Sequence, residues 1–164
     1  MKNEKQNAEH PSVAETRKFM DLLIEGNYDE LERFNEGGDF ELIKIMLKGT
    51  KKMQYRLNSI KYNDEKAIVN ITIRQPDLRV VNDKAVENFE KEDIDYDLLT
   101  DEEKNSVVKR ILNKTIQEEL ESDNLEYFKE TLDLTYTKKG RNWIRETSNE
   151  DEFFDILMSK LNQE

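Results

Sequence analysis

The spacing of apolar residues changes near residue 51, and this change constrains the fold more than any other feature of the chain. Before it, apolar residues recur every three or four positions, as on one face of a helix. After it, apolar and polar residues alternate, as in a strand with one buried face, most clearly at Ala67, Val69, Ile71 and Ile73. Pro76 ends this run, because proline has no N–H to donate to a sheet. We therefore expect two antiparallel strands joined by a turn at residues 63–64.

The first strand of this pair is predicted to be irregular. Met53, Tyr55 and Leu57 alternate and so lie on one face of the strand. Ile60 and Tyr62 continue the apolar alternation one position out of step. Such a shift predicts a β-bulge or a switch of face between the two groups.

A second pair of strands is expected near the C-terminus. Alternation returns after residue 126, on Phe128, Leu132, Leu134 and Tyr136. Lys138, Lys139 and Gly140 predict a hairpin turn, followed by a strand through Trp143.

Helices are predicted before, between and after the two hairpins. Ser12 with Glu15 and Thr100 with Glu103 have the spacing of capping boxes, which satisfy the free N–H groups at the start of a helix. Other helices are expected over residues 29–34, from residue 39, over residues 78–89, and after a cap within residues 148–151. The order is ααα-ββ-αα-ββ-α. It predicts an α+β fold, in which helices pack on one face of an antiparallel sheet of about four strands, with a helical insertion over residues 78–122.

Composition excludes several classes of function. The chain has 164 residues, no Cys, one His and a formal net charge of −11. We expect no nucleic-acid partner, because affinity for phosphates comes from an excess of Lys and Arg. Without Cys and with His10 alone, we also expect no metal site built on thiolates or imidazoles, no catalytic triad and no cofactor.

The excess of negative charge is local. Residues 1–82 hold 14 basic and 14 acidic side chains, whereas residues 83–103 hold 2 and 10. Residues 48–66, by contrast, have a net charge of +4. We expect either that the acidic segment folds over this basic hairpin, or that each is a separate surface for a partner. The residues chosen as a candidate interaction surface are Asp93, Asp95, Asp97, Lys51, Lys52 and Arg56.

The acidic segment imitates a calcium loop only in part. Asp93, Asp95 and Asp97 occupy positions 1, 3 and 5 of such a loop. Position 6, which needs Gly, is Leu98, and position 12, which needs Glu, is Lys104. We therefore expect a solvated acidic loop and no metal site.

Three stretches of the chain resemble the cystatin-like, nuclear-transport-factor-2-like superfamily. Residues 26–31, Gly-Asn-Tyr-Asp-Glu-Leu, resemble its opening between two helices, and residues 132–144 resemble its closing hairpin. Residues 70–78, which end in Pro-Asp-Leu, are similar to a strand end in Gram-positive lipoproteins of that superfamily. The resemblance implies an extracytoplasmic, lipid-anchored domain, with residues 1–11 as a disordered tether, including His10, and residues 12–164 as the fold. The insertion over residues 78–122 departs from the pattern of the superfamily and could cover the concave face of the sheet, where enzymes of the superfamily hold their ligands. A cytoplasmic location is the alternative.

The function expected from these patterns is non-catalytic binding or assembly with an unknown protein or envelope component. The membrane would be reached only through the removed lipid anchor. One alternative is a small enzyme of the superfamily, an isomerase or hydrolase with an apolar ligand between sheet and helices; its candidate hydrogen-bond donors are Tyr55, Tyr62 and Tyr136. The other is an assembly subunit resembling the extracytoplasmic domains of conjugation machinery.

Overall fold

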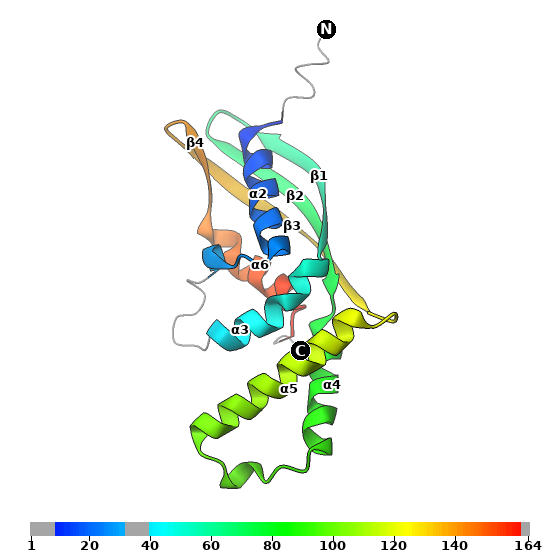
Figure 1. Ribbon diagram of the computed structural model, residues 1–164. Coiled ribbons are helices and arrows are strands. Elements are labelled where there is room, and N and C mark those ends of the chain that lie inside the picture. Colours follow the sequence, from blue (N-terminus) through cyan, green and yellow to red (C-terminus); the bar gives the residue numbers. More distant parts are fainter. Residues whose placement is uncertain (1–8, 32–39, 162–164) are drawn as a thin grey trace.

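The computed structural model describes residues 9–31 and 40–161 (Figure 1). Four strands form one antiparallel sheet in the order β1-β2-β3-β4. Their bounds are β1 Gln54–Tyr62, β2 Lys66–Pro76, β3 Tyr127–Lys139 and β4 Asn142–Arg145. The helices are α2 Pro11–Glu25, α3 Phe40–Met46, α4 Leu78–Lys91, α5 Asp101–Glu121 and α6 Glu150–Leu157, with a 3₁₀ helix over Leu47–Lys52. The α+β class predicted from the sequence is confirmed.

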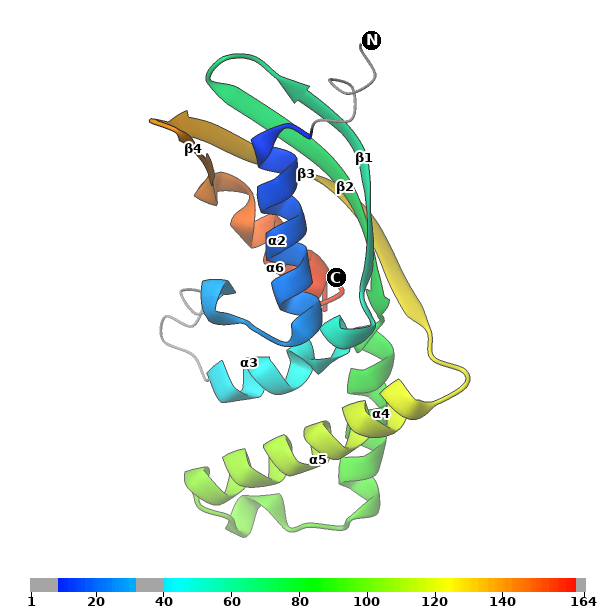
Figure 2. The same ribbon diagram turned by 45° about the horizontal axis from the view of Figure 1, so that its top comes forward.

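The sheet curves around α2 and α6, which lie along its concave face (Figures 1 and 2). The predicted inward residues of β2, Ala67, Val69, Ile71 and Ile73, are all fully buried. The register between β1 and β2 shifts between Leu57 and Ser59, which is where the sequence predicts the bulge. Alternation therefore determined both the buried face and its interruption.

Apolar side chains pack between the sheet and these two helices. Phe19, Met20 and Leu23 of α2 are buried. They belong to one apolar cluster with residues of β3 and α6: Leu132, Leu134, Tyr136, Phe153, Ile156 and Leu157. This cluster lies between the sheet and the helices, where the enzyme alternative expected an apolar ligand.

The N-terminal boundary of the fold differs from the prediction. His10, which we assigned to the tether, is the N-cap of α2: its Nδ1 accepts a hydrogen bond from the backbone N–H of Ser12 at 3.1 Å. Ser12 is buried inside the helix and does not form the predicted capping box. The helix starts at Pro11 because proline suits the first turn, where no N–H is needed. Residues 1–8 of the expected tether lie outside the described residues.

The helices expected over residues 29–34 and from residue 39 lie partly outside the described residues. Residues 29–31 form a 3₁₀ turn where we expected a second helix, and the rest of that helix lies outside the described residues. So does Asp39, the expected cap of the next helix.

The insertion does not cover the concave face of the sheet. Helices α4 and α5 pair with each other and project beyond the end of β2 and β3, and α3 packs against α5 (Figures 1 and 2). We call residues 78–121 the arm, and the sheet with α2 and α6 the body. The predicted capping box at Thr100 and Glu103 is present at the start of α5.

Candidate functional site

The three predicted aspartates lie in the loop that joins α4 to α5, at the end of the arm far from the body (Figure 1). Asp93, Asp95 and Asp97 are all exposed. No group of three or more His, Cys, Asp or Glu side chains in the described ranges is placed to hold a metal ion. The loop is therefore a charged surface.

The predicted basic residues do not meet these aspartates. Lys51 and Lys52 end the 3₁₀ helix and Arg56 lies on β1, all three exposed. Lys61 and Lys66 lie at the other end of β1, about 30 Å away for a strand of nine residues. The acidic segment does not fold over the basic hairpin, because the turn between β1 and β2 and the loop of the arm lie at opposite ends of the molecule (Figures 1 and 2). The acidic segment and the basic hairpin are therefore separate surfaces, which is the second of the two arrangements expected.

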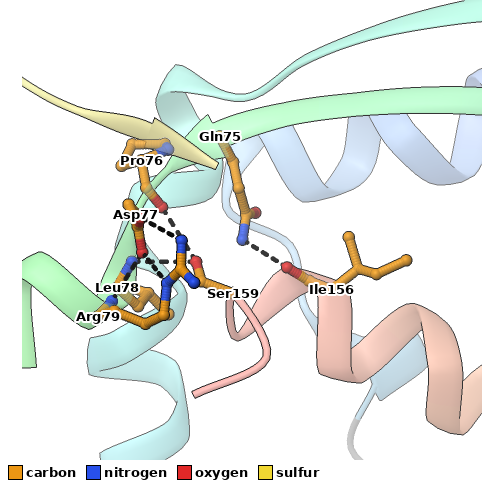
Figure 3. A network of polar contacts seen from close by, with 7 residues as sticks. All are labelled: Gln75, Pro76, Asp77, Leu78, Arg79, Ile156 and Ser159. Atoms are coloured by element: carbon orange, nitrogen blue, oxygen red, sulfur yellow. Dashed lines mark hydrogen bonds and ion pairs between the residues drawn. The ribbon is translucent and has the colours of Figure 1, made fainter. Parts of the chain in front are cut away.

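Buried polar contacts join the end of β2 to α6 and the start of α4 to the turn after α6 (Figure 3). Gln75, at the end of β2, donates from Nε2 to the carbonyl of Ile156 at 2.9 Å and also to that of Leu157. Ser159 Oγ accepts from the backbone N–H of Leu78, the first residue of α4, at 3.0 Å. Gln75 and Ser159 are almost fully buried, so these bonds are sheltered from water.

Asp77 completes this attachment as the N-cap of α4. Its carboxylate accepts from the backbone N–H of Arg79 at 3.0 Å and from the guanidinium of Arg79 at 3.0 and 2.8 Å. Burial alone would raise the pKa of Asp77, but the hydrogen bonds and charge of Arg79 outweigh it and lower this pKa below its ordinary value. The Pro-Asp-Leu segment singled out in the sequence therefore fixes where the arm leaves the sheet.

Polar contacts also pair the two helices of the arm. Lys84 Nζ donates to Glu119 Oε1 at 2.6 Å, and Asn88 donates to Thr115 Oγ1 at 2.9 Å. Nearer the loop, the guanidinium of Arg110 holds both carboxylate oxygens of Glu92 at 3.0 and 2.7 Å and lowers the pKa of that carboxyl. These contacts hold α4 and α5 together.

Helices α3, α4 and α5 line an open groove of about 270 Å³. Helix α5 packs against both α3 and α4 and so forms the floor of the groove between them. Eight of its nine lining residues are apolar; the lining is Leu42, Met46, Asn82, Ala85, Val86, Phe89, Val108, Ile111 and Leu112. The groove is smaller than the roughly 300–1,000 Å³ of small-molecule pockets, so its size suits a few apolar side chains of another segment.

Acidic and apolar side chains are exposed beside this groove. Asp83, Glu87 and Glu90 lie on α4 next to the groove residues and are exposed. Val86 is 51% exposed, and Leu98, in the loop with the three aspartates, is 80% exposed. The arm thus combines an apolar recess with a negative margin.

A second cavity, of about 360 Å³, lies between α2, β4 and α6 and contains charged groups. The guanidinium of Arg145 lies 3.5 Å from Glu150 Oε1 and 3.7 Å from Glu30 Oε2, and its carbon is 3.7 Å from the ring centre of Phe19. The hydroxyl of Tyr136 is 2.7 Å from Thr16 Oγ1, and burial raises the pKa of this phenol. Arg145 therefore has two carboxylate neighbours. We interpret the cavity as part of the packing between α2 and β4.

Neither the groove nor this charged cavity was found from the sequence. The groove residues of α4 and α5 lie on helices that the sequence predicts, but the spacing of apolar residues does not show whether another element covers them. Arg145 carried no local signal, since its carboxylate neighbours come from positions 115 residues earlier and 5 residues later in the chain. Of the three tyrosines considered as donors, Tyr136 is buried, Tyr55 is half-buried and Tyr62 is exposed.

No helix among the described residues is long and apolar enough to cross a membrane. Comparison of the chain with models of known protein families, with curated proteins and with solved structures finds no match.

Proposed function

We propose that this chain is a non-catalytic binding domain whose arm docks a basic, amphipathic helix of a partner protein. The observation that carries the proposal is the groove between α3 and α4, which is apolar inside and acidic at the margin formed by α4. Helices commonly bind in such grooves by inserting apolar side chains spaced three and four residues apart. A positively charged polar face on that helix would complement residues 83–103, which have a net charge of −8.

Two observations favour binding over catalysis. An apolar cluster fills the centre of the space between the sheet and α2, and the cavity beside β4 is lined mainly by charged side chains, which do not suit an apolar ligand. Among the described residues, the pKa is displaced for three carboxyl groups, those of Asp77, Glu92 and Glu103, and each of these pKa values is lowered. A general acid in an apolar site needs a raised pKa. Neither observation favours the isomerase or hydrolase alternative.

We propose further that the domain belongs to the cystatin-like, nuclear-transport-factor-2-like superfamily and works outside the cytoplasm on a lipid anchor. The curved sheet wrapped around α2 supports the first part, and the sequence resemblances support both. The native gene tests the second part: a signal peptide with a lipidated Cys upstream of residue 1 is expected. A native reading frame that starts at Met1 would contradict it and favour a cytoplasmic location.

The binding proposal can be tested with a designed peptide, because no natural partner has to be known. The probe is a fluorescein-labelled amphipathic helix of about 18 residues, or five turns, with Leu on one face and Lys on the other. Its affinity is measured by fluorescence anisotropy at low and moderate salt. A peptide with Glu in place of Lys, and one with the same residues in scrambled order, are expected to bind at least about tenfold more weakly, a difference of about 1.4 kcal/mol.

Matched variants show whether the groove is the site. Val86→Asp places a charge at the groove, whereas Ile144→Asp makes the same change at a residue of similar exposure, 46%, on the body. Val86→Asp should weaken binding by about tenfold or more, because an unpaired charge opposes burial, and Ile144→Asp should leave it unchanged. Replacing Asp93, Asp95 and Asp97 with Asn should weaken binding a few-fold and flatten its salt dependence. Equal effects of Val86→Asp and Ile144→Asp would overturn the proposal.

The same variants separate a partner segment from a second copy of the chain. Sedimentation velocity over a range of protein concentrations is expected to show a monomer. Oligomers that Val86→Asp abolishes would make a second copy the occupant of the groove, and would favour the assembly alternative over a partner helix.

A further inference from the structure

The end of the body opposite the arm carries a turn with three exposed cations. Lys138 and Lys139 end β3, and Arg141 precedes β4. Gly140 between them has a φ of 63°, a left-handed conformation that glycine adopts without strain and that the tight turn requires. None of the three cations has an ion-pair partner in the described part of the chain, so their charges face solvent.

Exposed apolar side chains gather at the same end. Five large apolar residues of the described chain are prominently exposed: Tyr62, Ile68, Val86, Leu98 and Ile144. Val86 and Leu98 belong to the arm. Tyr62, Ile68 and Ile144 lie at the other end, near the two hairpin turns, where no described element covers them. The exposed apolar surface therefore divides between the arm and this opposite end.

An aromatic cluster supports these exposed residues. The ring of His10 lies between Tyr62 of β1 and Trp143 of β4, with both ring centres 4.5 Å from its own. The start of α2 thus joins the two edge strands at the end where they approach each other (Figure 2). Aromatic rings with one polar edge, next to Lys and Arg, are the residue types that favour the boundary between lipid and water.

We infer that this end of the body, defined by Lys61, Lys66, Lys138, Lys139 and Arg141 with Tyr62 and Ile144, docks on the headgroups of an anionic lipid bilayer. We call it the basic end. The described chain also enters the fold here, because Glu9 and His10 precede α2 at this end (Figures 1 and 2). A lipid anchor upstream of residue 1 would therefore hold the basic end at the membrane and present the arm outward.

The magnitudes suit orientation of an anchored protein rather than capture from solution. Each Lys or Arg near an anionic leaflet strengthens binding roughly fivefold, so the three cations of the β3–β4 turn contribute roughly a hundredfold. The exposed carboxylates Asp64 and Glu65, and Glu146 at 3.7 Å from Lys66, cancel much of the effect of Lys61 and Lys66. A patch of this size complements a lipid chain, which is the usual second signal for stable membrane binding.

The charge of the arm does not prevent this docking. Strand β3 alone has 13 residues, about 44 Å of extended chain, and the arm begins beyond its far end. Salt screens charges over about 8 Å at physiological ionic strength, so the acidic loop lies several screening lengths from the bilayer. The overall charge of −11 therefore overstates the repulsion felt at the basic end.

This inference rests on the proposed lipid anchor for its setting and is independent of peptide binding by the arm. Trp143 is the only tryptophan of the chain and lies at the basic end. An Asn3→Cys variant, in a chain with no other Cys, can be coupled to a maleimide lipid in vesicles that also contain brominated lipids. Quenching of Trp143 by bromine then reports docking of the basic end.

The comparison is between vesicles of phosphatidylcholine and vesicles with about 30% phosphatidylglycerol, at low and high salt. We expect quenching to be about twofold or more greater on the anionic vesicles, and the difference to vanish at high salt. Changing Lys138, Lys139 and Arg141 to Gln should abolish the difference. The matched control changes three exposed cations elsewhere, Lys91, Lys114 and Lys129, to Gln; it alters the net charge equally and should preserve the difference.

Two outcomes would overturn the inference. Equal quenching on both vesicle types would remove it, as would equal effects of the two triple variants. Inorganic polyphosphate that binds the chain without vesicles, as tightly as the anionic bilayer does, would assign the turn to soluble polyanions instead of lipid. Each of these results leaves the peptide affinity of the arm unaffected, so failure here and failure of the proposed function are distinguishable.

Discussion

The body and the arm differ in how much of their apolar surface is covered, and the difference indicates which of them is available for binding. In the body, the inward residues of β2 are fully buried beneath α2. In the arm, polar contacts pair α4 with α5, and the groove leaves apolar surface such as that of Val86 exposed. Burial dominates the stability of the body, whereas the arm leaves apolar surface uncovered that a partner can bury.

The largest expected contrast comes from the same substitution in the two regions. Val69→Ala removes two methyl groups from a fully buried site in β2 and should lower the free energy of unfolding by about 2–3 kcal/mol. Val86→Ala, at a residue 51% exposed on α4, should change it by less than about 0.5 kcal/mol, as is usual for surface positions. Urea denaturation measures both. Equal losses would mean that the arm is packed as tightly as the body.

The junction between body and arm should be the next most sensitive place. Ser159→Ala leaves the buried N–H of Leu78 without its acceptor and should lower the free energy of unfolding by about 1–3 kcal/mol. Ser106→Ala, on the exposed face of α5, is the matched control and should stay within about 0.5 kcal/mol of the unaltered chain. A neutral Ser159→Ala would show that the arm does not depend on this attachment.

A smaller and more local effect is expected at the far end of the arm. Thr100 caps α5 by accepting from the backbone N–H of Glu103 at 3.1 Å. Thr100→Ala should destabilise the first turn of α5 by about 0.5–2 kcal/mol. Amide hydrogen exchange should quicken there and stay slow in β2 and β3, because the arm can open without the body. Faster exchange throughout the chain would instead mean that body and arm unfold as one unit.

The smallest expected effect is a response of the basic end to acid. Burial lowers the pKa of His10 from its usual 6.5, and its Nδ1 must be unprotonated to cap α2. Because the folded pKa lies below the unfolded one, this contribution to stability is complete above the unfolded pKa and is lost as pH falls through the folded value. Trp143 emission should change over that range, since the two rings are 4.5 Å apart.

His10→Asn is the control for this titration, because asparagine also caps helices and does not titrate. It should keep α2 intact and remove the change in Trp143 emission. An identical titration in this variant would assign the change to another group.

Much of the fold could be predicted from the sequence, because period and capping are local properties. The alternation through Ile71, the bulge after Leu57 and the cap at Thr100 each depend on residues a few positions apart. The predicted cap at Ser12 was wrong for an equally local reason. His10 caps the helix two residues earlier and Pro11 begins it, so Ser12 lies inside the first turn, where it is buried.

The candidate sites were harder to predict, because they depend on residues far apart in the chain. The charge of residues 83–103 was evident, and their exposure agreed with it. The groove was not evident, since it needs α3 and α4 beside α5 and no other element of the described residues above them. The surface around the cations of the β3–β4 turn was not evident either. It includes Tyr62, which lies about 80 positions away in the chain and at the same end of the sheet.

The sequence by itself determined where strands and helices lie, which face of each is apolar, and that the negative charge is concentrated in one segment. Only the tertiary structure decided that this segment projects away from the sheet, that the concave face is closed by α2 and α6, and that the arm and the basic end point in opposite directions. The physical reason is that periodicity marks a face for burial without naming its partner, and the partner is selected by packing among all the faces at once.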